Sequence, residues 1–282
     1  LPLLLGQRNV HQLRRRGKEA WLTIGPWSHV TPGGMVEGLG QAIMTFADIA
    51  AGRKPHAGRD RVRLYLQGAG QWREYPSWPP PQSTPIRFYL DADGRLESEL
   101  PAANGATSYV YDPANPTPAV HGPQLMGGPK RREMSELEQR NDTILFTSAP
   151  MVRDCDVIGP VDVELSIRSD REHTDFYACL CDVDAKGRSF QVSDGYLRLK
   201  PAQPDADTSG VRRIVITCWP TAYRFRRGHK LRLIIASGAH PRYARNLGTG
   251  EPLVTATGMV PARQEVLHGA DHCSSLSLRI VS

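Results

Sequence analysis

The sequence has 282 residues, a hydrophobic content of 40%, a charged content of 23% and a formal net charge of +6. These values are ordinary for a globular protein and leave room for one large domain or two smaller ones. No apolar run approaches the roughly 20 residues that cross a bilayer, so we expect no membrane partner.

The positive charge does not predict a nucleic-acid partner. It comes mainly from arginines spread along the chain, with small clusters at 14–16 and 131–132. A nucleic-acid-binding protein usually gathers its basic residues on one element or face and interleaves them with aromatic residues. We therefore expect no nucleic-acid partner, and we attribute the arginine bias to a GC-rich genome.

The cysteines and the N-terminus bear on where the protein works. Five cysteines in a long chain form an odd and sparse set, which suits a reducing cytoplasm better than a disulfide scaffold. Cys179 and Cys181 share one face of a predicted strand, but no second Cys/His pair stands at zinc spacing, so we expect no metal or other cofactor. The opening residues lack the features of a signal peptide. Because the chain does not begin with methionine, we expect Leu1 to lie inside a longer gene product.

The first 58 residues show an α/β pattern. A helix is predicted over 7–16, ending at Gly17, and a short buried strand over 20–24. A Gly/Pro-containing loop follows, and then a second helix over 36–51. The apolar face of that helix is predicted to carry Leu39, Ile43, Phe46 and Ile49.

From residue 59 onward the pattern is that of a mainly β protein. Short strands with period-2 alternation, such as 161–167, are separated by turns such as Asp93-Gly94 and Lys186-Gly187. Many short strands and 23 prolines predict a C-terminal β-sandwich or jelly roll over 59–282. A long surface loop is predicted over 117–139. The strands are predicted at 62–66, 86–90, 108–111, 143–147, 161–168, 175–182, 211–218, 231–236 and 275–281.

The most informative segment is Gly25-Pro-Trp-Ser-His29, directly after the predicted strand 20–24. Chemistry in α/β sheets collects at the carboxyl ends of the strands, so His29 is a candidate catalytic residue. A loop histidine alone is also compatible with a structural role.

Several stretches together resemble the CocE/NonD family of bacterial serine hydrolases, which includes cocaine esterase, X-Pro dipeptidyl-peptidases and α-amino-acid ester hydrolases. They follow one another in the family's order and cover nearly the whole chain. The matching stretches are 20–29, 64–74 with 77–81, 90–96, 175–189, 194–198, 219–233 and 241–250. The resemblance implies that 1–58 is the C-terminal remnant of an α/β-hydrolase catalytic domain and 59–282 a jelly-roll domain of X-Pro dipeptidyl-peptidase C-terminal type.

The resemblance also assigns a reaction and a role to His29. The implied reaction is acyl transfer to water through an acyl-enzyme, on a small-molecule ester or an X-Pro peptide, with His29 as general base. The family's Gly-x-Ser-x-Gly nucleophile motif is absent from this sequence, and its acid is expected upstream of Leu1. Triad members act as a unit, so we predict that this chain alone is inactive. The jelly roll is expected to pack on the catalytic domain and shape its pocket, and the resemblance also allows for a homo-oligomer.

Other motifs favour structural roles. Asp182-Val-Asp-Ala-Lys186-Gly imitates the start of a calcium loop, but Lys186 occupies a ligand position, so a hairpin turn is predicted. Asp271-His-Cys273 cannot form a relay, because neighbouring strand residues face opposite ways. The polar loop 240–246 is predicted to be pinned by arginine hydrogen bonds. For Trp27, Trp72 and Trp78, substrate contact and packing between domains remain open alternatives.

Two other functions remain open. A non-catalytic β-sandwich module that binds carbohydrate or protein would need an exposed aromatic platform, for which the strands offer only scattered residues. The residues that could build this platform are Tyr65, Phe88, Tyr89, Tyr109, Tyr111, Phe176 and Tyr177.

A split enzyme, with the nucleophile on a separate chain, is the other alternative.

Overall fold

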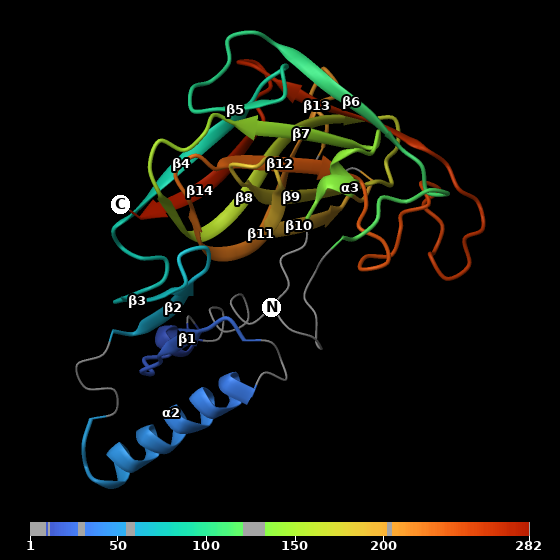
Figure 1. The fold of residues 1–282 in the computed structure, drawn as a ribbon. Helices are drawn as coiled ribbons and strands as arrows, with labels where there is room; N and C mark the ends of the chain where they lie inside the picture. The colour runs from blue at the N-terminus through green and yellow to red at the C-terminus, as the bar shows by residue number, and fades with distance from the viewer. Residues whose placement is uncertain are drawn as a thin grey trace.

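The computed structural model describes residue 10 and residues 12–27, 32–54, 60–120, 133–201 and 205–281, and all counts and absences below refer to these residues. The protein is mainly β, as the sequence predicts. Figure 1 shows a large sandwich with a small sheet beneath it and one long helix on the far side of the small sheet. No helix among the described residues is both long and apolar enough to span a bilayer.

The small sheet joins the beginning of the chain to the sandwich. Its strands are β1 (Leu22–Ile24), β2 (Val62–Leu66) and β3 (Gln71–Tyr75), in that order across the sheet. β1 runs parallel to β2, and β2 pairs antiparallel with β3. The connection from β1 to β2 contains helix α2 (Pro32–Ala50). A parallel pair requires such a crossover, because a tight turn can only join antiparallel strands.

The large sheet contains 11 strands and folds over itself as a sandwich. Its order is β10-β9-β12-β7-β5-β4-β14-β8-β13-β6, and β11 pairs with β8. The long strands alternate apolar and polar residues, which gives each one an inward and an outward face. The strands are β4 (Ser83–Leu90), β5 (Arg95–Glu97), β6 (Gly105–Tyr111), β7 (Thr143–Ser148), β8 (Cys155–Ser169), β9 (Asp175–Val183), β10 (Ser189–Arg198), β11 (Arg212–Phe225), β12 (Lys230–Ala236), β13 (Ala262–His268) and β14 (Ser275–Val281).

Strand β9 is buried on both faces, which places it at the centre of the fold. Phe176 and Leu180 face the main core between the two layers of the sandwich. Tyr177, Cys179 and Cys181 point the other way, into a second cluster. That cluster is completed by the short helix α3 (Ser135–Glu138) and the loop that follows β12.

The small sheet is attached to the sandwich by backbone hydrogen bonds as well as apolar packing. The Gln67 amide donates to the Ala222 carbonyl at 2.9 Å, and the Arg224 amide donates to the Gln67 carbonyl at 2.8 Å. Gly68 has a φ of +78°, and a Cβ there would lie 2.4 Å from the Arg224 carbonyl oxygen. This close approach requires glycine, so the β2–β3 hairpin is seated directly on β11.

The structure corrects one prediction and extends others. The surface loop predicted over 117–139 is wrong at its C-terminal end, because Met134 and Leu137 are fully buried on the outer face of the β9 layer. The predicted strands are all present, most of them longer than expected. Strands β3, β5, β10 and β13 were not predicted, since polar residues and glycine interrupt their alternation.

Candidate functional site

The predicted catalytic residue, His29, lies in the segment 28–31, outside the described residues. Both sides of that segment are described, and they meet at one side chain. The Trp27 indole packs against Gly25 and Gly34: a Cβ on Gly25 would lie 2.6 Å from Cε2 of Trp27, and one on Gly34 would lie 2.8 Å from its Cγ. Since real Cβ atoms do not approach other heavy atoms this closely, a side chain at either position would force Trp27 to shift.

Trp27 continues into an aromatic cluster on the small sheet. Its ring centroid lies 5.7 Å from that of Trp72 on β3, at an interplanar angle of 49°. Tyr65 of β2 meets the same Trp72 edge-on at 5.5 Å, and the Arg63 guanidinium lies 4.3 Å from the Trp72 ring centroid. The structure therefore gives Trp27 and Trp72 a packing role at the junction of the two parts of the chain.

Helix α2 turns its polar side to the small sheet. Arg63 of β2 donates to Glu37 Oε1 at 2.9 Å, and Gln41 Nε2 donates to the same oxygen at 2.8 Å. The Thr23 hydroxyl of β1 donates to Gln41 Oε1 at 3.4 Å. The helix that follows the His29 segment is thus bonded to the strand that precedes it.

The opposite side of α2 is an apolar stripe, and it faces solvent. The predicted apolar face, Leu39, Ile43, Phe46 and Ile49, is 58–75% exposed. Met35, Val36 and Met44 are also exposed, and no residue of the helix is buried. An amphipathic helix in a folded protein normally buries its apolar face, so this stripe requires a cover that the described residues do not supply.

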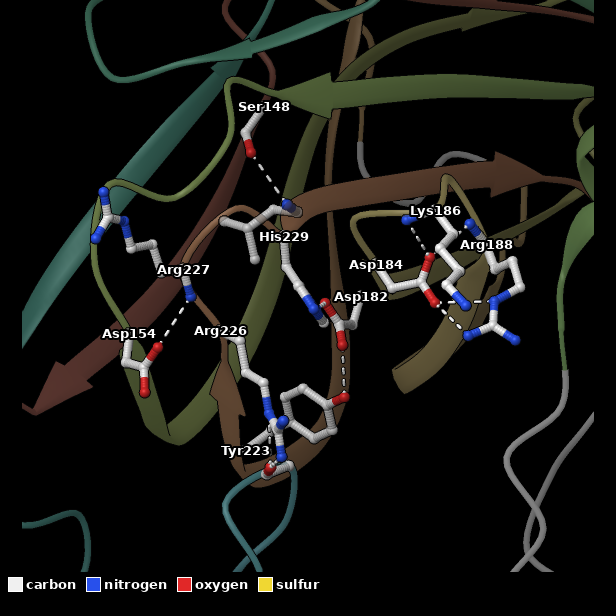
Figure 2. A network of polar contacts seen from close by, with 12 residues as sticks. Ser148, Asp154, Asp182, Asp184, Lys186, Arg188, Tyr223, Arg226, Arg227 and His229 are labelled. Carbon is white, nitrogen blue, oxygen red and sulfur yellow. Dashed lines mark hydrogen bonds and ion pairs between the residues drawn. The ribbon is translucent and has the colours of Figure 1, made fainter.

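A second polar site, which the sequence analysis did not single out, lies at the base of the sandwich (Figure 2). The carboxylate of Asp182 on β9 contacts His229 Nδ1 at 2.8 Å and accepts a hydrogen bond from the Tyr223 hydroxyl at 2.7 Å. Asp182 is buried and His229 is largely buried. The Ser148 hydroxyl, which is also drawn in Figure 2, accepts a hydrogen bond from the Leu231 amide and donates one to the Ala149 carbonyl, so it is engaged by the backbone. The site has a His–Asp pair but, among the residues that the structure describes, no free nucleophile beside it. Its bonds connect β9, β11 and the turn before β12.

The neighbouring Asp184 confirms the prediction of a hairpin turn in place of a calcium loop. Its Oδ1 accepts the backbone amides of Lys186 and Arg188 at 2.9 and 3.0 Å (Figure 2). Its other oxygen accepts the Arg188 guanidinium at 2.9 Å. Desolvation, the largest single effect, raises the pKa of Asp184. The hydrogen bonds from Arg188 and Lys186 and the charge of Arg188 together outweigh it and hold the pKa below its ordinary value.

The loop 240–246 is pinned to the sandwich by ionic hydrogen bonds, as predicted. Arg242 is paired with the buried carboxylate of Asp194 on β10. Asn246 Nδ2 donates at 2.9 Å to Asp175, which is also bound by Arg198. Tyr243 stacks on Tyr196 with ring centroids 4.1 Å apart. These contacts account for Arg242, Tyr243 and Asn246 without a ligand.

Comparison with known proteins identifies the family. Residues 57–277 match the family described as the X-Pro dipeptidyl-peptidase C-terminal non-catalytic domain. The chain belongs to this family. The match covers the β2–β3 hairpin and the sandwich as far as the beginning of β14. Trp72, against which Trp27 packs, therefore lies in the family's domain.

Relatives with known names extend the match toward the N-terminus. Cocaine esterase of Rhodococcus sp. is 26% identical over 296 residues, which cover 93% of this chain and 52% of the esterase. A putative serine esterase of Mycobacterium bovis is 26% identical over 275 residues, covering 79% of this chain and 41% of the relative. The chain therefore spans about half the length of the curated relatives that it matches.

Solved structures show the same fold. An aminopeptidase from a marine sediment Thaumarchaeota archaeon superimposes with a TM-score of 0.77 at 22% identity, over 94% of this chain and 47% of the other. A CocE/NonD family hydrolase from Staphylococcus aureus gives 0.67 at 14% identity, over 98% of this chain and 52% of the other. The resemblance to the C-terminal part of CocE/NonD hydrolases is confirmed.

The alternative function, binding of carbohydrate or protein, would need an exposed aromatic platform, and the described residues give it little support. Tyr109, Tyr111, Phe176 and Tyr177 are buried, so they build no exposed platform. A polar cleft of about 600 Å³ opens beside Tyr109 and Asp142. The Asp142 carboxylate in it is already bound by Arg140 at 2.6 Å and by the Thr117 hydroxyl at 2.7 Å.

Three of the five cysteines are buried side chains, and Cys155 and Cys273 are partly exposed. Cys179 and Cys181 are fully buried in the second cluster, with their sulfur atoms 3.6 Å apart, and Cys218 is buried in the main core. Burial raises the pKa of the Cys179 and Cys218 thiols well above the ordinary value, because a thiolate is poorly solvated there. Both thiols therefore remain protonated and unreactive at neutral pH.

Proposed function

We propose that this chain is the histidine-bearing C-terminal part of a CocE/NonD-type serine hydrolase, in which residues 1–58 complete an α/β-hydrolase domain and residues 59–282 form the jelly roll. One observation carries this proposal: the apolar stripe of α2 is exposed. β1 also lies at the edge of the small sheet, with one side unpaired among the described residues.

The cover for α2 is proposed to be the catalytic part that precedes Leu1. A helix connecting two parallel strands normally packs on a sheet, and β1 offers an edge on which such a sheet can continue. The relatives are about twice as long as this chain, which leaves room for the missing strands. In this arrangement α2 is buried on both sides, by the small sheet on its polar side and by the preceding catalytic part on its apolar side.

The role proposed for His29 is that of the general base. Its imidazole takes the proton of the serine nucleophile during attack on the acyl carbon and returns it to the leaving alcohol or amine. The serine, the acid and the oxyanion donors lie in the preceding part. The substrate is proposed to be a small-molecule ester or an X-Pro peptide, and the enzyme to be cytoplasmic. The sandwich then has the same role as the family's non-catalytic domain and leaves the chemistry to the other half.

The first test uses the complete gene product. Its reading frame should encode Gly-x-Ser-x-Gly and then an aspartate upstream of Leu1. The purified product is assayed with a p-nitrophenyl ester and with an Xaa-Pro-p-nitroanilide, which also separates the two substrate classes. His29→Ala should lower kcat by about 10³-fold or more. His272→Ala, at a partly exposed histidine on the sandwich, is the matched control and should leave kcat unchanged.

The second test uses the two parts separately. The present chain alone should give no ester turnover that depends on His29. When it is mixed with the separately expressed upstream part, the two should associate through α2. Phe46→Ser with Ile43→Ser should abolish that association while leaving the fold of this chain intact, since both side chains are exposed. Undiminished association would show that α2 is covered by something else, and turnover by the chain alone would contradict the division of the triad.

A further inference from the structure

The Trp27–Trp72 contact connects the non-catalytic domain to the segment that carries His29. Trp72 lies on β3, inside the family match that begins at residue 57, whereas Trp27 directly precedes the segment 28–31. Their rings are in contact, with centroids 5.7 Å apart. This aromatic pair is therefore the nearest described connection between the sandwich domain and the proposed catalytic histidine.

Trp27 holds both ends of that segment. Gly25 lies on the near side of the segment and Gly34 on the far side, and both backbones rest against the same indole. The contact at Gly34 involves Cβ and Cγ of Trp27, at 2.9 and 2.8 Å from an added Cβ. These atoms lie next to the Trp27 backbone, so the ring cannot relieve a clash by rotation alone. Trp27 on one side of the segment and Gly34 on the other are therefore held against each other.

Trp72 is itself held by two further side chains. Tyr65 packs edge-on against it, and Arg63 stacks over its face. Arg63 is bound in turn to Glu37 of α2 at 2.9 Å and lies 3.6 Å from Glu74 of β3. These contacts tie Trp72 to β2, β3 and α2, so Trp27 packs against a ring that is itself held in place.

We propose that Trp72 is a positioning residue for His29, acting through Trp27, so that the domain described as non-catalytic sets the geometry of the catalytic histidine. The inference rests on the proposed role of His29 and adds to it a contribution from the second domain. Triad chemistry is sensitive to position, because an error of about 1 Å costs on the order of 100-fold in rate. The contacts of Trp27 with Gly34 and with Trp72 are a direct way to fix the position of the residues on both sides of the segment.

Two neighbouring glycines provide a matched test in the complete enzyme. Gly34→Ala places a methyl group against Trp27, whereas Gly33→Ala meets nothing within 4 Å. Both changes fall in the first turn of α2, and both favour helix formation by roughly 1 kcal/mol. Gly34→Ala should lower kcat by about 10- to 100-fold and change KM by less than about threefold, while Gly33→Ala should leave both unchanged.

Substitution of Trp72 tests the link from the other side. Trp72→Ala should produce the same kcat loss as Gly34→Ala, and Trp72→Phe, which retains a flat ring, should restore a large part of it. In this chain alone, the indole ¹⁵N–¹H resonances of Trp27 and Trp72 should shift in Gly34→Ala and stay in place in Gly33→Ala. The resonances report on the contacts of Trp27 with Gly34 and Trp72 even where no activity is present.

The outcomes separate the inference from the proposed function. If His29→Ala retains full activity, the proposed function fails, whatever the glycine variants do. If His29→Ala is inactive but Gly34→Ala and Trp72→Ala keep the wild-type kcat, the histidine is catalytic and the positioning role is wrong. Equal kcat losses in Gly33→Ala and Gly34→Ala would also overturn it, because only one of them reaches Trp27.

Discussion

Arg198→Met is expected to lower the free energy of unfolding by about 2–3 kcal/mol. The Asp175 carboxylate has no exposed side-chain surface, and Arg198 donates to its two oxygens at 2.9 and 2.8 Å. This pairing raises the pKa of Arg198 above its ordinary value, chiefly through the hydrogen bond to Asp175. Removing one partner of a buried ion pair costs about 3–5 kcal/mol. The expected loss is smaller because Asn246 and Tyr196 still bind Asp175, and because the Arg198 side chain is 35% exposed.

The assay is urea unfolding followed by far-UV circular dichroism, with the midpoint compared at constant slope. Arg188→Met is the matched control, since Arg188 pairs with Asp184 on the same β9–β10 hairpin but is 51% exposed. An exposed pair contributes about 0–1 kcal/mol, so this variant should stay near the wild type. The reasoning is refuted if the two variants lose equal stability, because burial of the carboxylate would then not decide the cost.

Three further predictions concern the sandwich. Gly195→Ala should cost about 1–3 kcal/mol in thermal unfolding, because the new Cβ would lie 2.8 Å from a backbone oxygen of β11; Gly38→Ala, which meets no atom within 4 Å, should not destabilise the chain. His268 is buried and its pKa is lowered from 6.5 mainly by desolvation, so the native state keeps it neutral. As the pH falls below about 6.5 the unfolded chain takes up this proton first, so stability should decline, and His268→Gln should flatten that decline in urea titrations at pH 5–7. A decline that is the same in both proteins would assign it to other groups. Burial raises the pKa of Cys155 to about 11, so its alkylation rate should keep rising up to that pH, while Cys179 should label only after unfolding; mass spectrometry of labelled peptides distinguishes them. Labelling of Cys179 in the folded chain would contradict its burial.

The sequence by itself determined the class of fold and the family. Alternation such as that of 161–167 places every second side chain on one face, which is sufficient to predict a half-buried strand. Turns such as Asp184 to Gly187 are equally local, because the aspartate binds amides within its own turn. Ordered family stretches predicted the C-terminal part of a CocE/NonD hydrolase, and the family match agrees. His29 as the catalytic residue remains a prediction.

Only the tertiary structure decided what lies against what. Strand β10 is polar and contains Gly195, so its local pattern does not predict a strand, and it forms because β9 offers a complete row of partners. The Asp182–His229 pair and the Trp27–Trp72 contact join residues far apart in the chain, and no local spacing encodes them. The apolar stripe of α2 also shows what a sequence pattern leaves undecided. The helical period predicts which residues form the stripe, but only the fold shows that the polar side of the helix faces the small sheet. A sequence pattern gives each residue a face, whereas the neighbour of that face depends on the whole chain.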